Sequence, residues 1–267
     1  MRSGRRGGVA LWAAAAAAAV AVAFAPAAGA GQEGDDESPW TLEGEVGTSL
    51  YFGASDQTAF LINGGAEHES DDVVFGGEAG FEYGEARVLE GEPYVNKRSW
   101  SSKLNLDYAP DDRINPFLSL TAEGSYERRI DLRLSGGLGA RYQFVQGGSG
   151  RLDLSLSALV ERTDPRVESD EDDEIELLAR GSARFRARRS MREGGVVFDL
   201  VSFYKPALQE PSEDYTVEVT SSLTFALTNS VGLKLSLSDK YDSLAEDRGA
   251  RDNHDGRLFF SLTAASR

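Results

Sequence analysis

Two histidines are the side chains of this sequence best suited to act as a general base near neutral pH. His68 lies in an acidic stretch near a predicted strand end, and His254 lies in a charged stretch near the C-terminus. A histidine-dependent hydrolase would need the histidine, a serine nucleophile and an orienting polar group in contact. The predicted topology puts the two histidines in loops at opposite ends of the molecule. We therefore expect no catalytic residues and no enzyme activity.

Clustered carboxylates are the second feature with possible chemistry, because hard cations such as Ca²⁺ prefer oxygen ligands. One acidic run covers residues 168–174. A second group lies near the C-terminus and comprises Asp242, Glu246, Asp247, Asp252 and Asp255. Neither has the spaced ligands and glycine of a calcium loop, so solvated loops are the favoured interpretation. We expect no metal site and no cofactor; divalent cations bridging these loops to anionic lipopolysaccharide stay a hypothesis.

The stretch 130–144 shows which kind of element positions the charged side chains. Its apolar residues fall on one parity: Ile130, Leu132, Leu134, Leu138, Tyr142 and Phe144. Its polar residues fall on the other: Asp131, Arg133, Ser135, Arg141 and Gln143. A strand turns successive side chains to opposite faces, so this strand has one apolar and one charged face. The run exceeds the roughly five or six residues of an ordinary strand and suits a transmembrane barrel.

The alternation recurs from Trp40 to the end of the chain and predicts about twelve strands, an even number as in bacterial barrels. The ninth predicted strand is blurred, because Val197, Val201 and Phe203 break its parity. The longest connections follow the third, seventh, ninth and eleventh strands, which all end on one side. Aromatic residues near strand ends suggest two girdles at the membrane interfaces. These are Trp40, Phe52, Tyr83, Tyr108, Tyr126, Phe144, Tyr204, Tyr215 and Tyr241. The predicted fold is all-β: an antiparallel up-and-down transmembrane β-barrel.

The N-terminus reads as a targeting segment. Arg2, Arg5 and Arg6 precede an apolar, alanine-rich stretch over residues 9–25, and Ala28, Gly29 and Ala30 form a small-residue cleavage site. We predict a cleaved secretory signal peptide over residues 1–30, an acidic periplasmic leader over 31–39, and the barrel over 40–267. The expected location is the outer membrane of a Gram-negative bacterium.

Composition narrows the possible partners. The chain has 267 residues, no cysteine and a formal net charge of −16. The missing cysteines exclude disulfides and thiolate metal sites, and the acidic balance argues against nucleic-acid binding. The expected partners are outer-membrane lipid, lipopolysaccharide and the outer-membrane assembly machinery, and the protein is expected to be a monomer.

The candidate functional residues are the charged side chains on the inward parity of the predicted strands. They are Glu78, Glu82, Lys97, Lys103, Glu123, Arg133, Arg141, Asp153, Glu161, Arg180, Arg184, Arg186, Glu218 and Lys234. Both signs are interleaved, so one interpretation is a polar channel whose charged walls select solutes. The other is a salt-bridged interior that closes a narrow barrel. Twelve strands lie between filled barrels of about eight and open ones of about sixteen, so strand number does not decide. We favour the closed lumen, because opposite charges in a tight space pair.

Several motifs resemble a known family. Residues 40–49 read W-x-x-E-G-E-x-G-T-S, residues 137–144 read GLGARYQF, residues 203–206 read FYKP, and two further matches lie in 214–243. In order and spacing they resemble the YdiY-like family of salt-induced outer-membrane proteins, a domain family of unknown function. The resemblance covers nearly all of the chain after residue 40 and implies an outer-membrane location, but no activity.

The chain departs from the family in its first hairpin, where residues 54–58 replace the expected Ser-Gly-Asn-Thr-like turn. It departs from barrels in general at its C-terminus, where Phe260 is followed by seven further residues instead of ending the chain. Alternative functions are a porin-like channel for small solutes, a barrel-embedded hydrolase and a secreted soluble β-barrel binding protein. The soluble protein would bury its apolar face inside.

Overall fold

The structure is a computed structural model, and it describes residues 40–51, 55–88, 94–147, 149–166 and 176–266. The predicted signal peptide and leader, Phe52, and the acidic run 168–174 lie outside the described residues. Among the described residues, no helix is long and apolar enough to cross a membrane.

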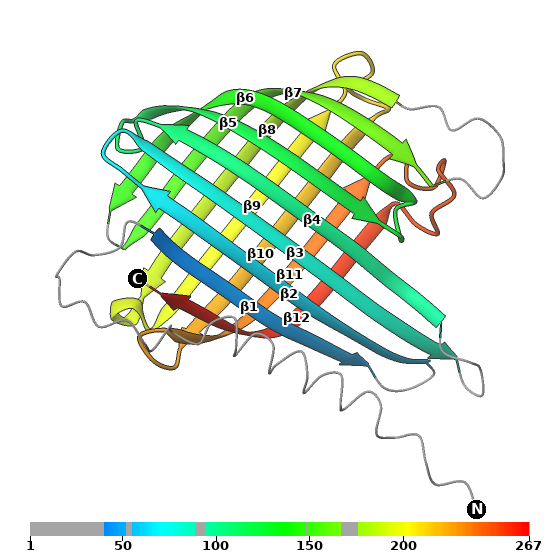
Figure 1. Ribbon diagram of the computed structural model, residues 1–267, viewed down its shortest axis with the longest axis horizontal. Helices are drawn as coiled ribbons and strands as arrows, with labels where there is room; N and C mark the ends of the chain where they lie inside the picture. The colour runs from blue at the N-terminus through cyan, green and yellow to red at the C-terminus, as the bar shows by residue number, and fades with distance from the viewer. Residues whose placement is uncertain (1–39, 52–54, 89–93, 148, 167–175, 267) are drawn as a thin grey trace, which may run out of the picture.

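Twelve strands and one short 3₁₀ helix make up the described chain (Figure 1). The strands are β1 (Trp40–Tyr51), β2 (Ser55–Glu69), β3 (Val73–Val88), β4 (Tyr94–Tyr108), β5 (Ile114–Ser125), β6 (Ile130–Gly147), β7 (Gly150–Pro165), β8 (Glu176–Met191), β9 (Val196–Pro206), β10 (Tyr215–Ala226), β11 (Val231–Asp242) and β12 (His254–Ser266). The 3₁₀ helix η1 (Arg192–Gly194) joins β8 to β9. Each strand has 11 to 18 residues, which is long enough for a tilted strand to cross a bilayer.

Every strand pairs antiparallel with its neighbours in the chain, and β1 also pairs with β12, so the sheet is a closed barrel. At the seam, Val46 of β1 lies opposite Leu262 of β12 on one side and Ile62 of β2 on the other. Closure leaves no strand edge unpaired, which is what a barrel in lipid requires. The predicted all-β antiparallel barrel of about twelve strands is confirmed.

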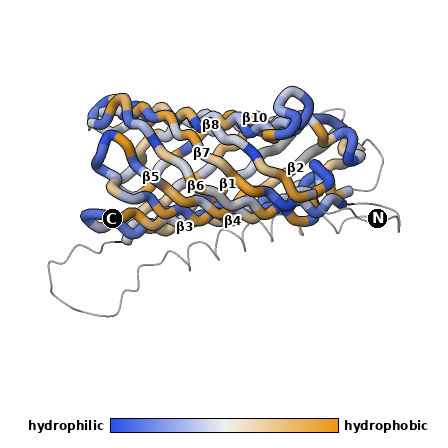
Figure 2. The backbone as a smooth tube through the Cα atoms, turned by 90° about the horizontal axis from the view of Figure 1, so that it is seen from above, coloured by the Kyte–Doolittle hydropathy of each residue, from blue (hydrophilic) through white to orange (hydrophobic). Residues whose placement is uncertain are grey.

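The distribution of polarity is inverted relative to a soluble protein. Among the described residues, five buried side chains are apolar, whereas eighteen buried ones are polar or charged. Large apolar side chains lie on the outside: Leu138 is 69% exposed and Phe260 is 57% exposed. Figure 2 shows apolar and polar positions alternating along the strands, with mainly hydrophilic connections at both ends. The apolar face of the sheet therefore points out of the barrel and the charged face points in.

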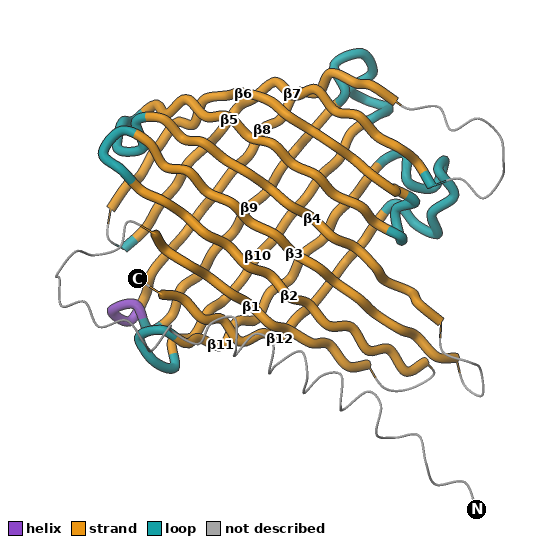
Figure 3. Tube along the Cα trace, in the orientation of Figure 1, coloured by secondary structure: helices purple, strands orange, loops and turns teal. Residues whose placement is uncertain are grey.

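The barrel has two unlike ends and a flattened cross-section. We call the end that holds the start of β1 and the end of β12 the terminal end; η1 and the connection from β10 to β11 lie there (Figure 3). The opposite end, with the connections from β9 to β10 and from β11 to β12, is the loop end. Figures 1 and 2 together show that the barrel is thinner along the view of Figure 1 than across it. The wall that contains β5 therefore lies close to the wall that contains β11.

The structure corrects the predicted side-chain direction of Ile130 and gives the directions in β9 that the sequence left open. Ile130 was expected on the outward face, but it is fully buried. The pairing of β6 with β7 shifts register between Ile130 and Leu132, and such a bulge changes the face that a side chain occupies. In β9, whose parity the sequence left open, Val197, Val201 and Phe203 line the interior cavity described below.

Candidate functional site: the charged interior

Charged side chains fill the interior at the loop end of the barrel. We call this set the loop-end ion cluster. Its members are Glu82, Lys97, Glu123, Arg128, Arg133, Glu161, Arg180, Lys205, Asp214, Glu218, Lys240, Asp242, Arg248, Asp255 and Arg257. They come from every strand except β1 and β2 and from three of the connections between strands.

Glu123 of β5 is the centre of the larger part of this cluster. One of its oxygens accepts a hydrogen bond of 3.2 Å from Arg128, which lies in the β5–β6 turn. Arg133 of β6 lies 3.6 Å away, and the ammonium group of Lys240 lies 2.9 Å from the second carboxylate oxygen. Three cations thus surround one carboxylate. Glu123 is 14% exposed and Arg133 and Arg128 are 6% exposed, so these pairs are largely removed from water.

The cluster connects opposite walls of the barrel. Lys240 lies on β11 and Glu123 on β5, which are six strands apart in either direction around the closed sheet of twelve. Arg133 of β6 donates to Asp242 of β11 at 3.3 Å, which is a second link across the lumen. Lysine and glutamate side chains can span a lumen only where the walls lie close together, in agreement with the flattened cross-section.

The cluster continues around the wall from these links. Glu161 of β7 accepts a 2.8 Å hydrogen bond from Arg180 of β8, and Arg180 also contacts Asp214 of the β9–β10 connection. On the far side, Lys97 of β4 lies 2.5 Å from Asp255 of β12. Arg257 of β12 reaches Glu82 of β3. The loop end is therefore tied together both along the wall and across the lumen.

Arg128 lies in the turn between β5 and β6. Burial alone would lower the pKa of its guanidinium group, because it disfavours the charged form. The adjacent carboxylate of Glu123 outweighs that effect, and the pKa rises above the ordinary arginine value. Arg128 therefore stays charged at any pH that the protein meets, and its charge supports the ionised form of Glu123.

An interior cavity of about 800 Å³ lies beside the loop-end ion cluster. Its lining runs from Arg188, Val197 and Ala265, near the terminal end, to Arg128 and Lys240 of the cluster. The structure brings eight of the fourteen predicted lumen residues to its wall. These are Glu78, Glu82, Lys103, Glu123, Arg184, Arg186, Glu218 and Lys234.

The other six predicted residues do not line this cavity, and their charged groups contact partners in the wall or in the cluster. Lys97, Arg133, Glu161 and Arg180 belong to the loop-end ion cluster. Nearer the terminal end, Arg141 lies 3.0 Å from Asp107, and Asp153 accepts a 2.8 Å hydrogen bond from Arg151.

Sequence reasoning missed several members of the cluster. Lys240 and Arg257 share the inward parity of their strands with neighbours such as Ser238 and Phe259, so alternation alone could have found them. Arg128, Asp214 and Arg248 lie in connections, where no alternation marks a direction. For those three residues the sequence holds no signal that predicts burial.

The histidines and the C-terminal carboxylates take positions that differ in part from the expectation. Both histidines lie within strands and not in loops: His68 near the end of β2 and His254 at the start of β12. They do lie at opposite ends of the barrel. His254 Nδ1 is 3.2 Å from Asp239, and both side chains are well exposed. Asp242 and Asp255 form ion pairs with arginine side chains of the cluster. In the part of the chain that the structure describes, no group of three or more metal-binding side chains occurs.

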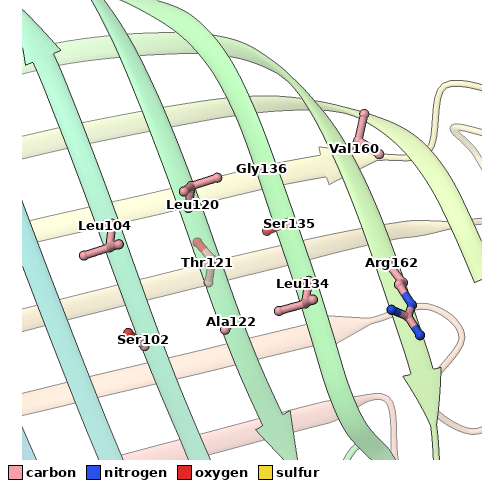
Figure 4. Close-up of a pocket in the computed structure, with 10 residues that line it drawn as sticks. All are labelled: Ser102, Leu104, Leu120, Thr121, Ala122, Leu134, Ser135, Gly136, Val160 and Arg162. Atoms are coloured by element: carbon pink, nitrogen blue, oxygen red, sulfur yellow. The ribbon is translucent and has the colours of Figure 1, made fainter.

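A second hollow, of about 470 Å³, lies on β4 to β7. Figure 4 shows the residues that line it, among them Leu104, Leu120, Leu134 and Val160, one on each of these four strands. The polar residues Ser102, Thr121, Ser135 and Arg162 also line it. Leu104, Leu120, Leu134 and Val160 are among the large apolar side chains that are exposed. We therefore assign the hollow to the apolar outer surface.

Comparison with known proteins bears on this architecture. The model of a family described as "Protein of unknown function, DUF481" matches residues 44–265, which run from β1 to β12. The chain belongs to this family. Since the match includes both the seam and the interior cluster, the DUF481 domain is the barrel itself. No curated protein matches the chain.

Solved structures that resemble this DUF481 barrel are outer-membrane proteins. The NanC porin is 9% identical, with 85% of this chain and 100% of that chain covered and a TM-score of 0.50. An outer membrane channel from Pseudomonas putida F1 is 12% identical, with 88% and 99% covered and a TM-score of 0.50. At such identities the likeness shows the fold alone, which is that of outer-membrane β-barrels.

Proposed function

We propose that the protein is a non-enzymatic, integral barrel of the Gram-negative outer membrane, closed at its loop end by the loop-end ion cluster. The single observation that carries the proposal is the contact of 2.9 Å between Lys240 and Glu123 on opposite walls. An open pore keeps the side chains of facing walls apart so that water and solute can pass. Here they meet and exclude a wide aqueous path.

The inverted polarity supports the membrane location. A soluble binding barrel would turn its apolar side chains inward, whereas Leu138, Leu156 and Phe260 are more than half exposed. In water such a surface would drive association, while in lipid it lowers the free energy of the folded barrel. With the N-terminus in the periplasm, the terminal end faces the periplasm and the loop end faces outward. Lipid, lipopolysaccharide and the assembly machinery are then the partners, and the barrel is a monomer.

The processing that the N-terminus implies, and the salt response that only the family resemblance suggests, belong to the same proposal. Cleavage after Ala30 leaves a mature chain that begins at Gly31, and intact-mass measurement of outer-membrane protein tests that boundary. The YdiY-like resemblance implies more of this protein in cells grown at high salt. Quantitative immunoblotting of outer membranes from low-salt and high-salt cultures tests it, and equal amounts would remove the salt-induced designation.

Conductance in a planar lipid bilayer tests the closed lumen. Wild-type protein, refolded and checked by its heat-dependent gel shift, is expected to give no stable single-channel steps. Lys240→Gln removes the ammonium that joins the two walls and is expected to give measurable steps. Asp239→Asn, which changes an exposed carboxylate on the same strand, is the matched control and should stay silent. Steady steps from the wild-type protein would overturn the proposal.

A second function, a small-solute channel with defined selectivity, is favoured by one observation. The interior cavity of about 800 Å³ has charged walls that reach the terminal end, as a selective path requires. The same bilayer experiment separates the two functions. Wild-type steps whose ion selectivity changes in Arg184→Gln would support the channel, because that arginine lines the cavity.

A further inference from the structure

The wall formed by β7 and β8 holds four buried polar atoms that lack hydrogen-bond partners. They are Asp153 Oδ1, Ser155 Oγ, Arg184 Nε and Arg186 Nε. Asp153 is directly opposite Arg186 in the sheet, and Ser155 is directly opposite Arg184, so the four form one contiguous group, which we call the β7–β8 patch. Ser155, Arg184 and Arg186 line the interior cavity. Because buried polar atoms are nearly always hydrogen-bonded, four in one place indicate an occupant.

The arginines near the patch are incompletely neutralised by the protein. Arg186 reaches Asp199 at 3.3 Å and Arg188 reaches the same oxygen at 3.8 Å. Arg184 lies 3.8 Å from Asp153, whose other oxygen already accepts a hydrogen bond from Arg151. Four guanidinium groups thus share two carboxylates. The strand β8 therefore offers unused N–H donors and positive charge to the cavity.

Charges on the wall opposite β8 affect where in the cavity an anion would bind. In the closed sheet β8 lies six strands from β2, and the strands that flank β2 carry Glu43 and Glu78 on the cavity wall. Glu43 and Glu78 repel an anion in the cavity, although Lys103 lies directly opposite Glu78 in the sheet, and the arginines of β8 attract it. The field across the cavity therefore favours the β7–β8 patch over other positions.

We propose that the β7–β8 patch binds the oxyanion, carboxylate or phosphate, of a small solute. Arg184 and Arg186 donate from Nε, the geometry in which arginine recognises planar oxyanions, and the hydroxyl of Ser155 supplies a third donor. The proposal deepens the proposed function and rests on it for one point, that the ligand enters from the periplasmic side.

Isothermal titration calorimetry of the refolded barrel in detergent tests the site, with succinate and inorganic phosphate as separate probes at constant ionic strength. Saturable binding of either probe by wild-type protein is expected, and the probe that binds identifies a carboxylate or a phosphate ligand. Arg184→Gln and Arg186→Gln are expected to weaken binding by about ten-fold or more, the loss of a charge-assisted hydrogen bond. Arg184→Lys, which keeps the charge but lacks Nε, should also weaken it.

Arg189→Gln is the matched control, since Arg189 lies on the same strand, is exposed, and is absent from the cavity wall. Its affinity should equal that of the wild type. If an arginine variant fails the gel-shift assay for folding, Ser155→Ala replaces it, with the same expected direction. No saturable binding at millimolar concentrations, or an equal loss in Arg189→Gln, would overturn the proposal. In detergent the probe can reach both ends of the barrel, so its binding does not depend on which end is closed. A conducting wild-type barrel would therefore contradict the closed lumen without contradicting the binding result.

Discussion

The ammonium group of Lys240 lies 2.9 Å from Glu123 although the strands that carry them are as far apart as a barrel of twelve permits. The two partners differ in how much unpaired charge would remain if one of them were removed. Glu123 contacts three cations, Arg128, Arg133 and Lys240. Lys240 contacts two carboxylates, those of Glu123 and Glu218. Without Lys240, each of them would still contact another basic side chain. Removal of the carboxylate therefore leaves more uncompensated charge than removal of the ammonium.

This difference predicts unequal effects on stability. Glu123→Gln should lower the free energy of unfolding by about 3–5 kcal/mol, the usual cost of leaving buried charge unpaired. Lys240→Gln should lower it by about 1.5–3 kcal/mol, the value of a hydrogen bond to a charged group. Urea unfolding in lipid vesicles, followed by tryptophan fluorescence, measures both. Asp239→Asn, in an exposed pair with His254, should change it by less than about 0.5 kcal/mol. An equal effect of the two buried substitutions would contradict the central role of Glu123.

The apolar outer face predicts a dependence on depth in the membrane. Leu138 lies in the middle of β6, and Leu177 lies at the loop end of β8; both are highly exposed. Leu138→Arg should destabilise the barrel in lipid by about 2–4 kcal/mol, and Leu177→Arg by about 0–1 kcal/mol. The same unfolding assay measures both. If neither change lowered stability in lipid, the outer face would not be in contact with hydrocarbon.

Gly124 leaves room for the indole of Trp100, which lies directly opposite it on the neighbouring strand. A Cβ at Gly124 would lie 2.5 Å from Trp100 Nε1 and 2.9 Å from the carbonyl oxygen of Asp131. Gly124→Ala should therefore displace the indole, shift its fluorescence maximum and cost about 1–3 kcal/mol, as overpacking does. Gly147→Ala is the control, because nothing lies within 4 Å of its Cβ position. An unshifted spectrum for Gly124→Ala would show that the indole does not occupy this position.

Asp242 fastens the connection between β11 and β12. Its carboxylate accepts a 2.6 Å hydrogen bond from Arg248 of that connection and also contacts Arg133. Asp242→Asn should raise the rate of trypsin cleavage after Arg248 by about ten-fold, because cleavage follows the population of the opened connection. Intact cells treated with trypsin provide the measurement and also report which side the loop end faces. Asp252→Asn is the control: Asp252 lies in the same connection and accepts a hydrogen bond from the backbone N–H of His254, two residues further on. Equal cleavage of both variants would contradict the fastening.

Much of the fold follows from alternation, and little of the interior pairing does. Alternation predicts which strand face carries Arg133 or Glu161, because a side chain's face depends only on its position within a strand. It fails at Ile130, where a bulge interrupts the count. Alternation also does not predict that Glu123 meets Lys240, since partners across the lumen depend on strand tilt and on how flat the barrel is. Arg128 and Arg248 lie in connections, where no periodicity exists to read.

The links across the lumen also constrain how the barrel assembles. Glu123 and Lys240 are 117 positions apart in the chain, and Glu82 and Arg257 are 175 apart. Neither pair can form until the last strands have docked, so a partly built sheet holds these charges separated and hydrated. Expulsion of water from the loop end must then coincide with ring closure at the β1–β12 seam. Dehydration of the loop-end interior therefore depends on closure of the ring, and a chain without β12 should complete neither.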